Sequence, residues 1–206
     1  MRLQPFLETL RNKLNLDLQK TQYFMNTANF QGGWEVWLQC EIGFAFNGAN
    51  PNNVLLREVP YPSGNNINPF LAYRAGANPP AWEVANQNQA ARADFQISRM
   101  QGPPDTTFLE LKCRLQQETH LQTWTRLRND VEKIRALSAL NNTLNCIALL
   151  ATFGTFTQQD IQDLNWFYTG GRNARVLDYS QVMPIHTELQ NVALNGNQRT
   201  FIVGVS

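Results

Sequence analysis

One nearly uninterrupted apolar segment, residues 143–153, most limits how this chain can fold. Its central run, Cys-Ile-Ala-Leu-Leu-Ala at 146–151, is the longest in the sequence and falls far short of the roughly 18 to 20 apolar residues that a bilayer-spanning helix needs. A short apolar run without alternation is typical of a strand that is buried on both faces of a sheet. The sequence therefore predicts a sheet covered by helices on both sides, and no membrane insertion.

The segments around this strand supply the other layers of an α/β domain. Apolar residues at steps of three and four predict helices over residues 6–18, 34–46, 121–140 and 157–167. Alternating or β-rich segments predict strands over residues 54–59, 93–98, 106–113 and 201–205. Residues 61–92 form either a long irregular loop or a loop that includes an edge strand near 70–73. The order predicts one domain over residues 1–206, with a central mixed β-sheet flanked by helices.

Charge and cysteine usage narrow the functional classes. Seventeen Lys and Arg oppose sixteen Asp and Glu, so a net charge of +1 provides no overall field, and a polyanion has to be held by a local patch. Cys40, Cys113 and Cys146 are far apart within apolar stretches, which predicts buried free thiols in a reducing compartment. The first residues lack the apolar core of a signal peptide, so we expect a cytoplasmic protein.

Three charged side chains form the most informative constellation. Glu110 and Lys112 are two residues apart on a predicted strand and project from the same face, and Asp94 begins the neighbouring strand. Two carboxylates beside one ammonium form a hard-oxygen site that suits Mg²⁺, with Mn²⁺ as a substitute. Such a set supports metal-assisted hydrolysis of a phosphodiester. The competing interpretation is structural: Asp94 pairs with a neighbouring arginine, and the other two form a surface ion pair worth under about 1 kcal/mol.

Asp94, a gap of about one hairpin and then Glu-Leu-Lys at 110–112 resemble the signature of the PD-(D/E)xK superfamily of phosphodiesterases. That superfamily has the restriction-endonuclease-like fold, an α/β fold with a central mixed sheet. The resemblance covers about residues 31–153, roughly three-fifths of the chain. It departs at Ala93, where the signature has a proline that the superfamily commonly replaces.

The resemblance implies an activity and the residues that carry it. Asp94 and Glu110 are expected to hold a Mg²⁺ ion, with the carbonyl of Leu111 as a candidate third ligand. Lys112 is expected to act as the catalytic base or as a stabiliser of the transition state. The implied protein is a Mg²⁺-dependent nuclease whose partner is DNA.

An acidic residue on the preceding helix completes such a site. Glu41 is preferred over Glu35, because Glu41 lies on an apolar face where a carboxylate needs an ion or another partner. Gln116 and Gln117, which follow the strand directly, are expected to contact the scissile phosphate.

Composition also favours a second hypothesis, a catalytically silent binding protein that uses the same fold. DNA affinity comes largely from Lys and Arg contacts to phosphate, whereas this chain is nearly neutral and carries 23 Asn and 18 Gln. One such protein is an immunity or inhibitor protein that neutralises a bacterial toxin by binding it. The two hypotheses differ in partner, which is DNA in the first and a protein in the second.

Overall fold

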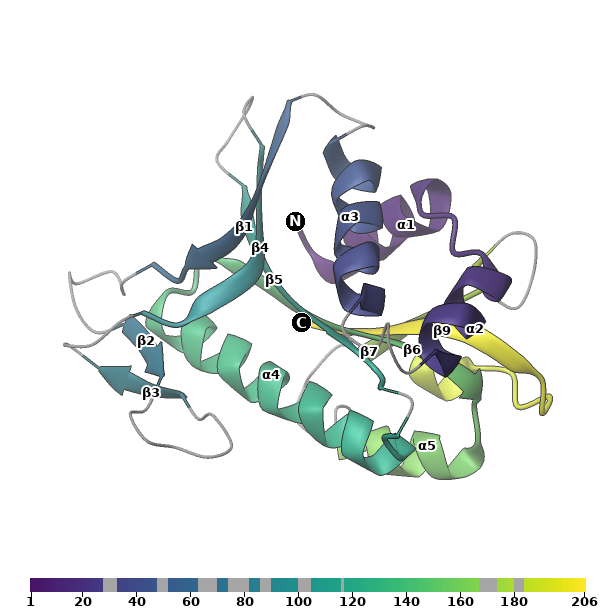
Figure 1. The fold of residues 1–206 in the computed structure, drawn as a ribbon. Coiled ribbons are helices and arrows are strands. Elements are labelled where there is room, and N and C mark those ends of the chain that lie inside the picture. The colour runs from purple at the N-terminus through teal and green to yellow at the C-terminus, as the bar shows by residue number, and fades with distance from the viewer. Residues whose placement is uncertain are drawn as a thin grey trace.

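A seven-stranded mixed sheet forms the middle layer of the molecule in the computed structural model of the chain (Figure 1). The structure describes residues 1–27, 33–47, 52–62, 70–73, 82–85, 90–99, 105–115, 117–166, 174–179 and 184–206. Its helices are α1 (Leu3–Lys13), α2 (Leu18–Asn26), α3 (Gly33–Asn47), α4 (His120–Leu140) and α5 (Gln158–Leu164), with a short 3-10 helix, η2 (Leu189–Asn191). Its strands are β1 (Asn53–Pro60), β2 (Phe70–Tyr73), β3 (Trp82–Ala85), β4 (Arg92–Arg99), β5 (Thr106–Cys113), β6 (Asn145–Thr155), β7 (Ala174–Asp178), β8 (Ile185–Glu188) and β9 (Gln198–Val205).

The strand order of the large sheet is β1-β4-β5-β6-β9-β7-β8. β4 and β5 pair antiparallel, which confirms the predicted hairpin, and β5 and β6 pair parallel. A parallel pair needs a crossover connection, and α4 provides it. The carboxyl ends of β5 and β6 therefore meet at one edge of the sheet, where α4 begins.

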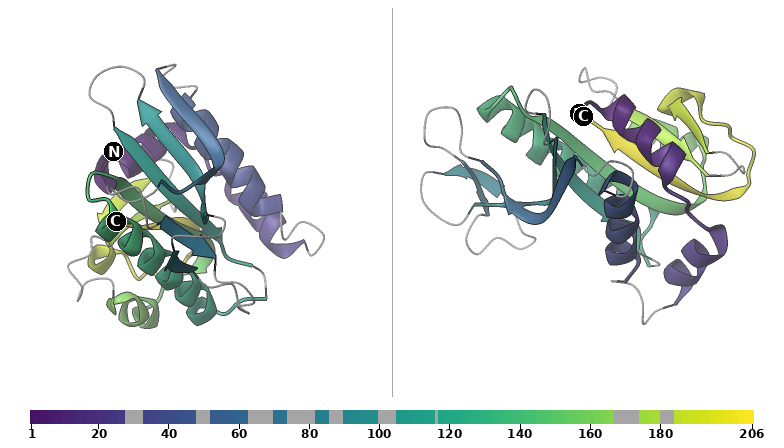
Figure 2. Two further views of the ribbon diagram at one scale, coloured as in Figure 1. Left: turned by 90° about the vertical axis from the view of Figure 1, so that its left-hand side faces the viewer. Right: turned by 90° about the horizontal axis from the view of Figure 1, so that it is seen from above.

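Helices cover both faces of the sheet, as the apolar segment predicts (Figure 2). Along β6, Ile147 and Leu149 join a buried cluster with the apolar side chains of α1 and α3, whereas Ala148 and Leu150 join a second cluster with those of α4 and α5. The predicted α/β class, with a mixed sheet between helices, is confirmed. None of the helices in the described ranges is long and apolar enough to cross a membrane.

The N-terminal helical pattern breaks where the sequence predicts that it continues. α1 ends at Lys13, and an extended stretch follows. Asp17 then caps α2 by accepting hydrogen bonds from the N–H groups of Gln19 and Lys20 at 2.7 and 3.1 Å. Because an N-cap aspartate satisfies the free N–H groups of a new helix, the apolar spacing over residues 6–18 spans two helices rather than one.

Residues 70–73 form a strand, but this strand is not an edge of the large sheet. β2 pairs antiparallel with β3 in a separate two-stranded sheet, which lies beside α4 (Figure 1). Strands of four residues are too short to show a period in the sequence. The hairpin of β2 and β3, which lies between β1 and β4 in the sequence, therefore has no clear signal in the amino-acid pattern.

Cys40 is exposed, contrary to the prediction, whereas Cys113 and Cys146 are buried, and all three thiols are free.

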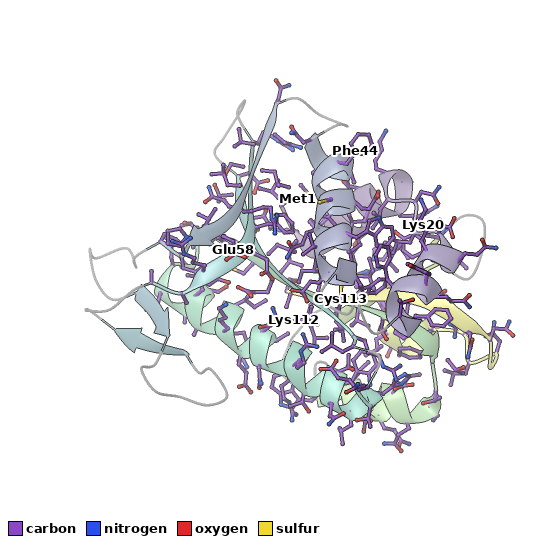
Figure 3. The ribbon with its side chains drawn as sticks, in the orientation of Figure 1. Met1, Lys20, Phe44, Glu58, Lys112 and Cys113 are labelled. Carbon is purple, nitrogen blue, oxygen red and sulfur yellow. The ribbon has the colours of Figure 1, made fainter. Side chains whose placement is uncertain are left out.

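α3 is apolar on nearly every turn, so the sequence does not show which side faces the sheet. Leu38 is on the buried side. Phe44 shares the outer side with Cys40 and projects away from the molecule with 73% of its surface exposed (Figure 3).

Gly204 of β9 lies where α1 packs closely against the sheet. A Cβ atom at this position would lie 2.8 Å from Cδ1 of Leu3 and 3.2 Å from Cδ2 of Leu149. We expect Gly204→Ala to lower the free energy of unfolding, measured by urea denaturation, by about 1–3 kcal/mol, the usual cost of overpacking a core. Gly43→Ala in α3 is the matched control, because its Cβ would meet Leu55 at an ordinary 3.7 Å and alanine favours a helix over glycine by about 0.5–1 kcal/mol. Equal losses in the two variants would contradict this account of the packing.

Candidate active site

Asp94 and Lys112 are brought together from neighbouring strands. The ladder between β4 and β5 ends at the pair of Phe95 and Leu109. Beyond that pair, Oδ2 of Asp94 accepts a hydrogen bond from the N–H of Leu111 at 2.6 Å, and it lies 3.7 Å from Nζ of Lys112. The Asp94 carboxylate thus accepts the N–H of Leu111 where the backbone pairing of β4 and β5 has ended, and it also pairs with Lys112, the lysine of the predicted motif.

Glu110 lies on the same face of β5 but has its own partners. It is only 2% exposed. Its Oε1 accepts a hydrogen bond from Nζ of Lys133 on α4 at 2.8 Å and another from the hydroxyl of Tyr61. Nζ of Lys133 also lies 5.2 Å from the centre of the Tyr61 ring. A buried carboxylate is stable only when it is paired and hydrogen-bonded, and Lys133 and Tyr61 fulfil both conditions.

Lys112 lies between two carboxylates. Its Nζ is 3.8 Å from Oδ2 of Asp130 on α4, in addition to its contact with Asp94. It also donates a hydrogen bond to the carbonyl of Leu111 at 3.1 Å. Figure 3 shows Lys112 in the space between β5 and α4. The carbonyl that the resemblance offers as a third metal ligand is therefore bonded to Lys112.

Two charged residues of α4, Asp130 and Lys133, belong to this cluster. The resemblance marks residues 130–133 as an acidic-basic run, but it gives neither residue a specific role. Both are buried, with 8% and 6% of their surface exposed. They are three residues apart and so lie on the same face of the helix, next to the buried Val131 and Ile134. A charged pair beside the apolar stripe of a helix is the sequence signal that could have revealed them. Tyr61 offered no such signal, because it follows β1 in a segment without a periodic pattern.

Of the two helix glutamates, the structure places Glu35, the less favoured one, beside the cluster. Oε2 of Glu35 accepts a hydrogen bond from the N–H of Cys113 at 3.2 Å. The pKa of Glu35 is raised, mainly by burial, with Lys112 opposing and Asp94 adding to the shift, which places Glu35 beside the cluster. Glu41 lies six residues further on, about 9 Å along the helix and on a different side of it. The sequence does not show which glutamate faces the cluster, because an almost wholly apolar helix does not reveal its orientation. A metal-binding role for either glutamate stays a prediction.

The polar residues that follow β5 include both of the predicted phosphate contacts. Gln117 is exposed in the connection to α4, and Gln116 lies outside the described residues. Arg126 of α4 donates a hydrogen bond to the carbonyl of Cys113 at 3.1 Å and forms an ion pair with Glu118 at 2.8 Å. A role for either glutamine in binding phosphate stays a prediction.

Burial and the crowding of carboxylates together set the protonation states in the cluster. Burial alone would lower the pKa of Lys112, but the four carboxylates around it together raise that pKa above its ordinary value. Burial is the main cause that raises the pKa of Glu110 to about 7, against the opposing charge of Lys133. Burial likewise raises the pKa of Asp130. Lys112 is therefore a permanent cation at neutral pH, and Glu110 titrates there.

Asp94 and Glu110 fit Mg²⁺ by the type of their donor atoms, which are hard carboxylate oxygens. Within the described part of the chain, no three or more Asp, Glu, His or Cys side chains are grouped so that they could hold an ion. Mg²⁺ commonly takes one or two protein carboxylates and keeps several waters, so two carboxylates satisfy its needs. The second of them, Glu110, has to exchange a bond to Lys133 for the ion.

The raised pKa of Glu110 makes stability fall as pH rises. Glu110 keeps its proton up to about pH 7 in the folded protein, whereas a carboxyl group of this kind in an unfolded chain has a pKa of about 4.3. Between these values the folded state binds more protons, so the free energy of unfolding decreases with pH. We expect urea denaturation at about pH 5 and about pH 8 to show a smaller decrease for Glu110→Gln than for the wild type. An identical decrease would mean that Glu110 does not titrate in this range.

Comparison of the chain with protein-family models, with curated proteins and with solved structures gives no match.

Proposed function

We propose that this chain is a Mg²⁺-dependent phosphodiesterase that cleaves DNA, with a restriction-endonuclease-like fold of the PD-(D/E)xK type. The contact between Asp94 and Lys112 across two strands carries the proposal. Glu110 lies on the same face, and Glu35 approaches from a helix on the other side of the sheet. A Glu-x-Lys sequence that occurs by chance is not expected to lie beside a second carboxylate from the paired strand, here Asp94, and a third from a helix, here Glu35.

The order of the elements supports the same proposal. β4 and β5 form the hairpin that carries the motif, α4 crosses over the sheet, and β6 returns parallel to β5. α3 precedes them and supplies the acidic residue. This is the arrangement that the resemblance predicts over residues 31–153.

Asp94, Glu110, Lys112 and Glu35 each have a role in this proposal. Asp94 and Glu110 hold the ion, which when bound polarises the phosphate and lowers the pKa of a water molecule. Lys112, whose Nζ lies 3.7 Å from Oδ2 of Asp94, acts as a positive charge near the phosphate oxygens. Glu35 provides a further acceptor at the end of β5.

Cleavage of a plasmid and of a linear duplex by the purified protein tests the proposal. We expect cleavage with Mg²⁺ or Mn²⁺ and none with EDTA. Asp94→Asn should abolish cleavage while the protein keeps its circular dichroism spectrum. Lys20→Met changes an exposed side chain of α2 (Figure 3) and should cleave as the wild type does. Absence of cleavage by the wild type with either ion would overturn the proposal.

The network around Glu110 favours a second candidate, the catalytically silent binding protein. Lys133 and Tyr61 already satisfy this carboxylate, so the fold needs no ion to stabilise it. The partner is then a protein, such as a bacterial toxin that the chain neutralises, in place of DNA. A ligand that binds only the folded state raises its melting temperature. If the second candidate is correct, we expect neither Mg²⁺ nor Mn²⁺ to support cleavage. We also expect neither ion to raise the melting temperature.

A further inference from the structure

Glu58, near the end of β1, has a left-handed backbone. Its φ of 51° is the only positive φ among the described residues other than glycine, and such a conformation is uncommon except for glycine and a few residues such as asparagine. The pairing of β1 with β4 includes Arg57 and Val59 but passes over Glu58. The carbonyl of Glu58 accepts a hydrogen bond from Nη1 of Arg92 at 3.0 Å. The residue opposite Glu58 in this register is Asp94, so the pairing is interrupted at the aspartate of the candidate site.

β1 reverses its two faces at this residue. Before the interruption, Leu55 packs against the buried cluster of α1 and α3, and Arg57 donates a hydrogen bond to Gln39 of α3. After it, Val59 and Tyr61 belong to the cluster of α4 and α5. Positions 55, 57, 59 and 61 would all lie on one face of a regular strand, because successive side chains alternate. The left-handed residue between them therefore turns the strand over.

β4 reverses its faces at the same level. Phe95 and Ile97 belong to the cluster of α1 and α3, whereas Ala93 belongs to the cluster of α4 and α5. Asp94 lies between them, and its Oδ2 accepts the N–H of Leu111 at 2.6 Å. Because the N–H groups of a strand point along the plane of the sheet, this bond places the Asp94 carboxylate in that plane. The reversal thus directs the Asp94 side chain at β5, and away from both helical layers.

The same reversal brings Tyr61 to Glu110. The N–H of Tyr61 bonds to the carbonyl of Ala91 at 2.9 Å, so the chain stays paired with β4 beyond Glu58. The Tyr61 hydroxyl donates to Glu110 on the side of the sheet that α4 covers. Regular alternation along β1 would place Tyr61 on the opposite side, under α1 and α3. One backbone conformation therefore affects the surroundings of both carboxylates of the candidate site.

We propose that Glu58 is a positioning residue of the candidate active site, whose left-handed backbone directs Asp94 toward β5 and Lys112. Residues in sparsely populated backbone conformations cluster at active sites, where the surrounding structure holds them. The exposed side chain of Glu58 lies on the curved part of β1 (Figure 3), so its backbone and not its packing has this role. The consequence for cleavage rests on the proposed nuclease function, whereas the position of Asp94 does not.

Melting temperatures test the left-handed conformation. Glycine adopts a positive φ without a steric cost but weakens a regular strand. We therefore expect Glu58→Gly to raise the melting temperature. Leu56→Gly, at an exposed and regularly paired position of the same strand, should lower it. A lower melting temperature in both variants would overturn the proposal.

The amide signal of Leu111 in protein labelled with ¹⁵N-leucine reports the bond to Asp94. Glu58→Val introduces a β-branched residue, which disfavours a positive φ, and should shift this signal upfield as the bond weakens. Glu58→Asn tolerates the left-handed backbone and should keep the signal near its wild-type position. Both variants remove the Glu58 carboxylate, so a difference between them reports the backbone. Leu56→Val is the control and should leave the signal unchanged.

Two results of this NMR experiment would overturn the proposal. One is an unshifted Leu111 signal in a folded Glu58→Val protein, and the other is an equal shift in Glu58→Val and Glu58→Asn. The comparison of melting temperatures does not depend on whether Glu58→Val folds.

Cleavage rates test the consequence for catalysis. Glu58→Val should lower the rate at saturating Mg²⁺ by about 100-fold, the scale of a misplacement by about 1 Å. Glu58→Asn should retain most of the rate, and Leu56→Val should cleave as the wild type does. A shifted Leu111 signal without a loss of rate would overturn the role of Glu58 in positioning. Failure of the wild type to cut DNA overturns only the nuclease proposal, because the melting temperatures and the Leu111 signal do not depend on cleavage.

Discussion

Lys112→Met should lower the rate of Mg²⁺-dependent DNA cleavage by about 100- to 1000-fold, the usual effect of removing one preorganised group that stabilises charge in a transition state. The lysine lies 3.7 and 3.8 Å from Asp94 and Asp130, so the change removes a cation that lies between these two carboxylates. The repulsion between these two carboxylates is then no longer offset, which disturbs the position of Asp94 as a metal ligand. Initial rates at saturating Mg²⁺, with circular dichroism as a check of the fold, measure the effect.

Lys112→Arg separates the charge of this residue from proton transfer. Arginine keeps its proton in proteins and cannot act as a base, but it carries the same charge. Lys112 lies between the carboxylates of Asp94 and Asp130 and is proposed to act as a charge, so we expect Lys112→Arg to retain more activity than Lys112→Met. Lys20→Met serves again as the control for loss of a lysine. Equal loss in the two Lys112 variants, with Lys20→Met fully active, would contradict a purely electrostatic role.

The fold was predictable from the sequence where the burial of a segment allows only one secondary structure and one position in the sheet. Residues 143–153 have apolar side chains on both faces and became the strand at the centre of the large sheet. α4 and α5 each begin with a capping box, at Thr119 and Thr157, and such a cap uses only residues that are close in sequence. The break between α1 and α2 was missed because leucines continue at helical spacing across it, while a single aspartate, Asp17, starts the second helix.

Only those residues of the candidate site that lie on strands were predictable, because the geometry of a strand determines which side chains share a face. Alternation along β5 places Glu110 and Lys112 on one face, and the hairpin brings Asp94 to Lys112. The partners from α4 depend on the depth and rotation at which that helix packs on the sheet, which a sequence pattern does not determine. Glu35 was undervalued for a related reason, because the apolar residues of α3 extend around the helix and hide its orientation. The sequence therefore predicted the strand residues of the site better than its helix residues.

Lys133→Met should lower the free energy of unfolding by about 3–5 kcal/mol above neutral pH, the usual cost of removing one partner from a buried ion pair. The Lys133 and Glu110 side chains are 7% and 3% exposed, so water does not replace the lost charge. The loss should be smaller at about pH 5, because Glu110, with a pKa of about 7, is then protonated. Urea denaturation at about pH 5 and about pH 8 measures both values.

Glu110→Gln, added to Lys133→Met, should restore most of the stability at the higher pH. The neutral amide needs no counter-charge, and its carbonyl can still accept the hydrogen bond from Tyr61. A double-mutant cycle then gives the coupling free energy of the pair, with exposed Lys13→Met as the control. A coupling near zero would contradict the buried pair. It would also remove the main reason to consider a silent binding protein, because Glu110 could then bind Mg²⁺ without the loss of a stabilising partner. A large coupling means that metal binding competes with this ion pair, so the nuclease would require high Mg²⁺ concentrations.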